Sequence, residues 1–434
     1  MLLRRPHLGL DLALPEDGAP GLVVMDLPPQ SPLAGRVPVG ARLLAIDGRP
    51  TDDLDGVRDL VRRLPVGHVC TLELGSVGWR APLRAQAGAR RSEGERRFRD
   101  SLSLELTLEA LPTEPMPHGR VELGEVDCGD YALRSIWTFP EEGPGPFPLI
   151  WLQPSANWLS EEHVQELWHP TLKLVQALTR LGHATLRVDR SGLGDSGGPP
   201  CIDTDLETEL GWCRAAHAHL LAHPAVDRDR VYLFGRSLGG TLVQLLAHEL
   251  RPAAAAVWGA TSLDWHEAMM ASVRRQRMLT GMKEPALSRF LALRRRLSEA
   301  VLLRGELPRD VLAREPELRV AGGDFEGGRA HGRLARFFQQ LQARDVAAEC
   351  ARYEGPLLVM RGELDWITRE EDAASVVAAA RRPTFRSFAG IDHLMHRRDE
   401  LAEAVAHTFG GDFDPVGAEA MVAFFASLRS RPVA

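Results

Sequence analysis

The stretch 230–250 constrains the fold of this chain more than any other part of the sequence. Residues 231–234 form a short apolar run of β-favouring residues, typical of a strand buried on both faces. Residues 238–250 favour a helix with leucines on one stripe. Between them, residues 235–239 have the pattern G-x-S-x-G. A strand-to-helix turn this tight needs glycines beside Ser237 and holds the serine hydroxyl clear of a sheet.

Strands and helices are expected to alternate around this turn, which predicts a parallel sheet with helices on both faces. A hairpin is expected at 120–140, and helices at 170–181, 204–223 and 369–381. Further strands are expected at 148–153, 183–189, 253–259, 356–361 and 384–388. From 262 to 353 the strand pattern stops and helical, charge-rich sequence takes over. This segment predicts an insertion that forms a cap.

A serine needs a base to accept its proton and a carboxylate to orient that base. Asp365 and His393 each follow an expected strand, downstream of Ser237. Because the carboxyl ends of parallel strands meet at one edge of a sheet, we expect these three side chains to converge there. Asp392 is the alternative acid, and His396 is the alternative base.

Together these motifs resemble those of the α/β-hydrolase superfamily. The resemblance covers about 120–430 and rests on the strand 148–153 with its loop and on the segments 189–197, 235–239, 362–365 and 392–393. Within the superfamily the chain is similar to the esterase, acyl-peptidase and dienelactone-hydrolase-like groups. The resemblance implies an α/β fold with a mostly parallel sheet at 101–434 and a helical cap at about 263–352.

The resemblance also implies roles for the converging residues. Ser237 would be the nucleophile, His393 the base and Asp365 the acid of a serine hydrolase that cleaves an ester, thioester or amide through an acyl-enzyme. The substrate would be a small molecule or a peptide, with no cofactor. Two alternatives stay open: a binding or scaffold protein with an idle hydrolase fold, and a transferase, cyclase or epimerase on the same fold.

The oxyanion hole is where the sequence departs from the superfamily. The resemblance implies one donor at the amide of Leu238 and a second in the loop after Gln153. The superfamily usually has His-Gly or Gly-Gly in that loop, whereas this chain has Gln153 followed by Pro154. Because proline has no N–H, the second donor is expected to be Ser155, with Ala156 as the alternative.

Residues 1–85 predict a separate β-rich module, followed by a linker rich in Arg, Gly and Glu at 86–100. The module resembles a bacterial-type PDZ domain in its Φ-Gly-Φ loop at 8–10 and in the segments 31–35 and 39–48, although Gly40 is followed by Ala41 instead of the usual Asp. The other interpretation of the module is a spacer that binds nothing.

If the PDZ resemblance holds, a protein or peptide C-terminus would add as a strand beside residues 11–14. Its carboxylate would then rest on the amides of Leu8, Gly9 and Leu10.

Charge and composition exclude other classes. The formal net charge of −7 argues against binding to nucleic acid or to an anionic membrane. Five scattered cysteines, no signal-like N-terminus and no long apolar window predict a cytoplasmic protein. His219 and His223 stand one helical turn apart without a third ligand, so no metal site is expected. The G-x-G-x-x-G at 192–197 leads into two prolines, which argues against a nucleotide site.

Three tryptophans are candidate walls of an acyl pocket: Trp158, Trp265 and Trp366.

Overall fold

The computed structural model describes residues 2–15, 19–27, 31–75, 101–156, 159–164, 166–408 and 410–428. It divides into two compact units. The N-terminal unit comprises Leu3–Pro115 with His163–Leu167, and the C-terminal unit comprises Met1–Leu2, Met116–Glu162 and Trp168–Ala434. The linker expected at 86–100 and the wall candidate Trp158 lie outside the described residues.

The N-terminal unit contains a sheet in the order β2-β3-β4-β6-β7, with β5 paired to β4. These strands are β2 (Asp11–Ala13), β3 (Leu22–Asp26), β4 (Arg42–Ile46), β5 (Arg49–Pro50), β6 (Val69–Gly75) and β7 (Leu102–Thr107). A short pair, β1 (Pro6–His7) and β8 (Glu109–Ala110), and one helix, α1 (Leu54–Arg63), complete the unit. The N-terminal region is therefore β-rich, as expected.

Strand β7 corrects the domain boundary expected at residue 101. It pairs antiparallel with β6 from Leu102 to Thr107, and Leu106 and Leu108 are buried in the N-terminal core. The alternation of polar and apolar residues at 101–111 is typical of a strand, but which sheet the strand joins depends on pairing with a distant segment. The N-terminal unit consequently extends to Pro115.

The C-terminal unit is built on a sheet in the order β19-β18-β14-β13-β11-β12-β10-β9. Its strands are β9 (Gly119–Asp127), β10 (Ala132–Pro140), β11 (Phe147–Gln153), β12 (Ala184–Val188), β13 (Val226–Arg236), β14 (Ala254–Trp258), β18 (Leu357–Gly362) and β19 (Pro383–Phe388). Strand β10 pairs antiparallel with both β9 and β12, and all pairs from β12 to β19 are parallel. The expected mostly parallel sheet is confirmed.

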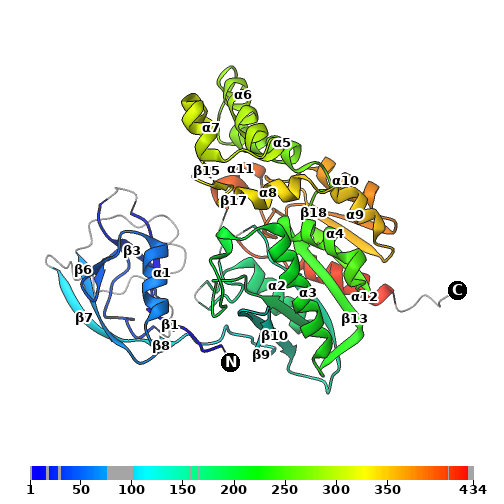
Figure 1. The fold of residues 1–434 in the computed structure, drawn as a ribbon. Coiled ribbons are helices and arrows are strands. Elements are labelled where there is room, and N and C mark those ends of the chain that lie inside the picture. The colour runs from blue at the N-terminus through cyan, green and yellow to red at the C-terminus, as the bar shows by residue number, and fades with distance from the viewer. Residues whose placement is uncertain are drawn as a thin grey trace. The chain divides into compact units, whose positions relative to one another are not determined.

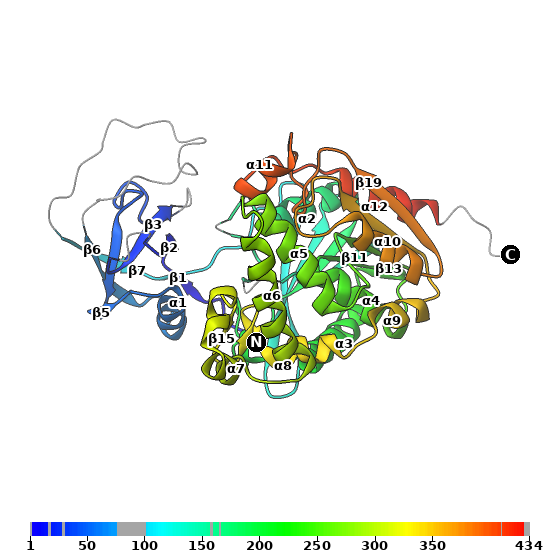
Figure 2. The ribbon, with the colours of Figure 1, turned by 90° about the horizontal axis from the view of Figure 1, so that it is seen from above.

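Helices cover both faces of this sheet because its central strands are apolar on both sides. In Figure 2, α2 and α12 lie on one side of β11 and β13, and α3, α4 and α9 lie on the other. The helices are α2 (Pro170–Arg180), α3 (Leu206–Ala222), α4 (Leu238–Leu250), α9 (Val346–Arg352), α10 (Glu370–Ala379), α11 (Leu401–Ala406) and α12 (Val416–Ser427). Two buried clusters, one on each side of the sheet, hold the layers together.

The segment between β14 and β18 is the insertion. It contains α5 (Trp265–Leu279), α6 (Ala286–Ser298), η3 (Glu299–Leu303), α7 (Pro308–Arg314), η4 (Pro316–Ala321), β15 (Phe325–Glu326), β16 (Arg329–Ala330), β17 (Arg333–Leu334) and α8 (Ala335–Gln342). Figure 1 shows α5, α6 and α7 grouped at one end of the unit. The following helix, α9, packs on α4 and α10 next to the sheet. No helix in the described part of the chain has the length and apolarity of a membrane span.

Candidate active site

Ser237 lies at the turn between β13 and α4, with φ 54° and ψ −125°. This backbone conformation is strained for a residue with a side chain. Such strain is found at functional turns. The flanking glycines make the turn possible, since a Cβ at Gly235 would collide with the backbone of Gly239. A Cβ at Gly239 would lie 2.7 Å from the carbonyl oxygen of Gln153. The strand–turn–helix context expected for Ser237 is therefore present.

His393 and Asp365 form a buried hydrogen-bonded pair. His393 Nδ1 lies 2.7 Å from Asp365 Oδ2, and the two side chains are 3% and 0% exposed. The carboxylate also accepts hydrogen bonds from the amides of Ile367 and Thr368 and from the Thr368 hydroxyl. Burial alone would raise the pKa of Asp365, but the His393 charge and the bonds from His393 and Thr368 outweigh it, so the pKa is lowered.

This pairing fixes what each ring nitrogen of His393 can do. An ionised carboxylate only accepts hydrogen bonds, so Nδ1 carries the proton of the bond to Asp365. The other ring nitrogen, Nε2, is then the basic atom of the neutral ring. The structure thus brings together the acid and the base that the sequence analysis named.

Two adjacent residues at the end of β14 connect this pair to Ser237. The carbonyl oxygen of Trp258 accepts the Ser237 amide at 2.9 Å, and Trp258 Nε1 donates to the carbonyl oxygen of His393 at 3.1 Å. Gly259, with φ +54°, lies so close to the pair that a Cβ there would be 2.9 Å from both Asp365 Oδ2 and His393 Nδ1. The sequence analysis included Gly259 only as the last residue of the strand expected at 253–259 and gave it no role in the site.

The alternative acid and base, Asp392 and His396, have a different set of hydrogen-bond partners. Asp392 Oδ1 accepts hydrogen bonds from the amides of Leu394 and His396, and Oδ2 accepts one from Arg398 Nε. His396 Nδ1 lies 3.7 Å from Asp392. The hydrogen bonds of Asp392 therefore stabilise its own loop, whereas Asp365 is the carboxylate that contacts His393.

The remaining sequence-named residues lie as follows. Leu238 is the first residue of α4, at the end where helix N–H groups have no partner within the helix. Ser155 lies in the loop after β11, and its carbonyl oxygen accepts a hydrogen bond from Arg190 at 2.9 Å. Trp366 contacts His393 edge-on with ring centroids 5.8 Å apart, whereas Trp265 stacks on Phe338 within the insertion.

The model of the serine aminopeptidase S33 family matches residues 165–400, which is more than half of the chain. The chain belongs to this family. It is thus a hydrolase of the α/β-hydrolase superfamily, and its C-terminal unit has that fold. The match includes Ser237, Asp365 and His393 and leaves residues 1–164 outside. The PDZ resemblance of the N-terminal unit therefore stays a prediction.

Solved structures similar to this S33-family chain are α/β proteins of low sequence identity. Est1E from Butyrivibrio proteoclasticus, with ferulic acid bound, is 19% identical with a TM-score of 0.47, over 71% of this chain and 100% of Est1E. The α/β-hydrolase GrgF from Penicillium sp. sh18 is 18% identical with a TM-score of 0.45, over 71% and 98% of the two chains. No curated protein matches the chain significantly.

The loop expected to hold a peptide carboxylate lies in the N-terminal unit. Gly9 has φ +67°, and the Ser31 hydroxyl donates to its carbonyl oxygen at 2.6 Å. The side chains of Leu8 and Leu10 are buried in the core of the unit. Strand β2 follows directly and pairs on one side with β3, as the outermost strand of its sheet in the described residues.

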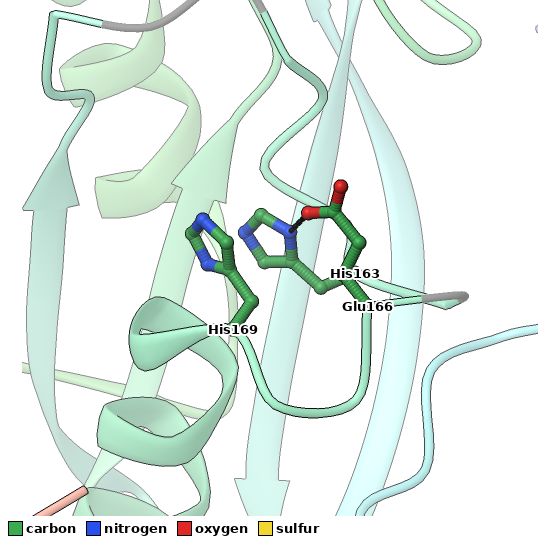
Figure 3. Close-up of side chains that lie close together, drawn as sticks. All are labelled: His163, Glu166 and His169. Carbon is green, nitrogen blue, oxygen red and sulfur yellow. Dashed lines mark ion pairs between the residues drawn. The ribbon is translucent and has the colours of Figure 1, made fainter. Parts of the chain in front are cut away.

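A cluster that the sequence analysis did not single out lies in the stretch 163–169 (Figure 3). The ligand atoms of His163, Glu166 and His169 lie within 4.8 Å of one another. His163 Nδ1 is 3.8 Å from a Glu166 carboxylate oxygen, and His169 Nδ1 accepts a hydrogen bond from the Thr171 amide at the start of α2. These contacts give both rings partners within the protein, and the cluster has no part in the function proposed below.

Proposed function

We propose that the chain is a serine hydrolase that cleaves an ester, thioester or amide through an acyl-enzyme on Ser237. The proposal is carried by the contacts of the segment Trp258–Gly259. Its Trp258 carbonyl oxygen accepts a hydrogen bond from the Ser237 amide, and Gly259 lies against the His393–Asp365 pair. These contacts support a common place for the proposed nucleophile, base and acid at one edge of the sheet. Each has the role that its chemistry allows: a hydroxyl nucleophile, an imidazole base and an ionised carboxylate.

The proposed mechanism has two halves. Ser237 Oγ attacks the substrate carbonyl carbon while His393 Nε2 takes the hydroxyl proton, and Asp365 stabilises the imidazolium through Nδ1–H. The amides of Leu238 and Ser155 hold the oxyanion. The bond to the leaving group then breaks as Nε2 returns its proton to that group. Water, deprotonated by the same nitrogen, then attacks the acyl-enzyme. The bond to Ser237 Oγ breaks as Nε2 returns the proton to that oxygen, which releases the acid product and the free serine.

The insertion is proposed to cover the acyl group. Arg275 on α5 donates from Nη2 to the carbonyl oxygen of Asp365 at 2.7 Å, so the insertion reaches the loop that carries the acid. Trp366, buried and edge-on to His393, supplies an apolar surface beside the reacting atoms. A lid held there would exclude water while the acyl-enzyme forms.

A fluorophosphonate probe tests this function. Wild-type protein is expected to be labelled at Ser237 alone, since only an activated serine reacts, and the Ser237→Ala variant is expected to take up no label. Mass spectrometry of the modified peptide identifies the site. Circular dichroism of both proteins checks that they are folded. Folded wild-type protein that takes up no probe would contradict the proposal and favour the idle-fold alternative.

We further propose that the N-terminal unit recruits a protein or peptide through its free C-terminus. The support is β2, an outermost strand that follows directly on the Φ-Gly-Φ loop at 8–10. An added strand would lie beside β2 on the side opposite β3, as in β-strand addition. The described cysteines are all free thiols, which supports a reducing, cytoplasmic environment for both units.

Matched peptides test the recruitment. A library peptide that binds in calorimetry is expected to bind roughly 10-fold more weakly or worse as its C-terminal amide, because charge-assisted hydrogen bonds to the carboxylate are lost. The same pair of peptides is then measured with the Gly67→Ala variant, which changes the unit outside the loop 8–10, at a positive-φ glycine with no atom near its Cβ position. The difference between the acid and amide forms should be the same in this variant. Equal affinity for acid and amide forms, or no binding peptide at all, would contradict recruitment.

A further inference from the structure

One buried side chain donates hydrogen bonds to two successive carbonyl groups of the loop after β11. The buried Arg190 donates from Nη2 to the carbonyl oxygens of Pro154 at 3.3 Å and Ser155 at 2.9 Å. In a trans peptide unit the N–H points opposite to the C=O. These two bonds therefore fix the directions of the Ser155 and Ala156 amides, which face away from Arg190. They are the two candidate donors of the second oxyanion position.

Arg190 is itself fixed by a buried chain of charges. Its Nε donates to Glu209 Oε1 at 2.9 Å, and the other oxygen of Glu209 accepts from Arg333 Nη1 at 2.7 Å. All three side chains are at most 2% exposed. Burial alone would raise the pKa of Glu209, but the charges and hydrogen bonds of Arg190 and Arg333 lower it overall, so Glu209 is ionised between two cations.

The far end of this chain of charges lies in the insertion. Arg333 is the first residue of β17, and its Nη2 donates to the carbonyl oxygen of Cys201 and to the Thr204 hydroxyl. Its guanidinium also lies 3.7 Å from the centre of the Phe337 ring in α8. The insertion and the loop after β11 are thus connected through two arginines and the carboxylate of α3.

The cavity next to Arg190 is small. It has a volume of about 20 Å³ and is lined by Gln153, Pro154, Asp189 and Glu209, among others. A space of that size is large enough for a water molecule. Asp189 is the neighbouring carboxylate, but burial raises its pKa to about 7, so Glu209 is the dependable counter-ion of Arg190.

We propose that Arg190, Glu209 and Arg333 are positioning residues that set the oxyanion donors of this active site and join them to the insertion. The inference rests on the proposed function. The chain lacks the glycines that usually shape this loop, and Arg190 supplies the orientation instead by pulling two successive carbonyl groups to its side. The three charges sum to one positive charge behind the donors, which favours an oxyanion in front of them.

The test measures the affinity of a trifluoromethyl ketone, which forms a tetrahedral oxyanion on the serine, beside KM and kcat per titrated active site. Arg190→Met is expected to raise the inhibition constant by roughly 100-fold and to lower kcat by a similar factor with KM within about 3-fold, the pattern of a lost oxyanion donor. Partial unfolding would lower the number of active sites without changing the inhibition constant.

Arg134→Met is the matched control. Arg134 is as buried as Arg190 and also pairs with a carboxylate, Asp195 at 3.2 Å, but its other bonds go to the carbonyl oxygens of Gly124 and Leu2. The inhibition constant of the Arg134→Met variant is expected to stay within about 3-fold of wild type, because Arg134 does not bond to the carbonyl groups of the loop after β11. An equal rise in both variants, or no rise in Arg190→Met, would overturn the inference.

Milder variants decide the outcome if Arg190→Met does not fold. Arg190→Lys keeps the charge but cannot reach both carbonyl oxygens and Glu209, so a rise of about 10-fold is expected. Arg333→Met, at the far end, is expected to give a smaller rise, and an unchanged constant in both would overturn the inference. Wild-type protein that is neither labelled nor inhibited would instead show that the proposed function is wrong.

Discussion

Changing His393 to glutamine is expected to lower kcat/KM for the best ester substrate by roughly four to six orders of magnitude. Glutamine has a similar size and keeps an N–H for the bond to Asp365, which is now 2.7 Å long. It cannot take a proton from Ser237, so the serine stays a weak nucleophile. Asp365→Asn is expected to cost about four orders of magnitude, because the imidazole then takes the wrong tautomer. Both are measured as steady-state rates per folded protein.

The alternative pair provides the control for this prediction. Asp392→Asn and His396→Gln remove groups that are as buried as the catalytic candidates and are close to them in sequence. Asp392→Asn is expected to lower the free energy of unfolding by about 3 kcal/mol, since Arg398 would lose its buried carboxylate. The remaining folded protein should keep a rate within about 10-fold of wild type. Activity that survives in His393→Gln and disappears in His396→Gln would assign the base to His396.

The local parts of the site were predictable from the sequence. The turn at Ser237 is encoded within five residues, because only glycine fits at 235 and 239 once a strand runs directly into a helix. Asp365 and His393 were proposed from the order of the chain, since each follows a strand of a parallel sheet. These arguments need only neighbouring residues and the rule that parallel strands end at the same edge.

The parts that were missed depend on contacts between distant segments. Strand β7 has the alternation of a strand, but its partner β6 was visible only in the folded sheet. Arg190 and Glu209 are 19 positions apart, and Arg333 follows 124 positions after Glu209. A sequence in which charged residues are common gives no reason to pair these three. Their buried positions follow from how α3 and the insertion pack against the sheet.

Gly259 provides the second large effect. Gly259→Ala is expected to lower kcat/KM by roughly 100-fold or more, because a Cβ 2.9 Å from Asp365 Oδ2 and His393 Nδ1 must displace the pair, and small misplacements of catalytic groups cost about that factor. The free energy of unfolding should fall by about 1–3 kcal/mol, from overpacking and from an alanine at φ +54°. Urea unfolding and active-site titration measure the two effects separately.

Gly305→Ala separates the displacement of the pair from backbone strain. Gly305 has φ +74° and no atom within 4 Å of its Cβ position, so its variant carries the strain alone and should lose about 1 kcal/mol with an unchanged rate. If Gly259→Ala kept the wild-type rate, the His393–Asp365 pair would tolerate displacement and could not be the catalytic pair. If both variants lost activity equally, the loss would come from instability. A loss confined to Gly259→Ala therefore tests whether this end of β14 aligns the base with Ser237, the arrangement on which the proposed mechanism depends.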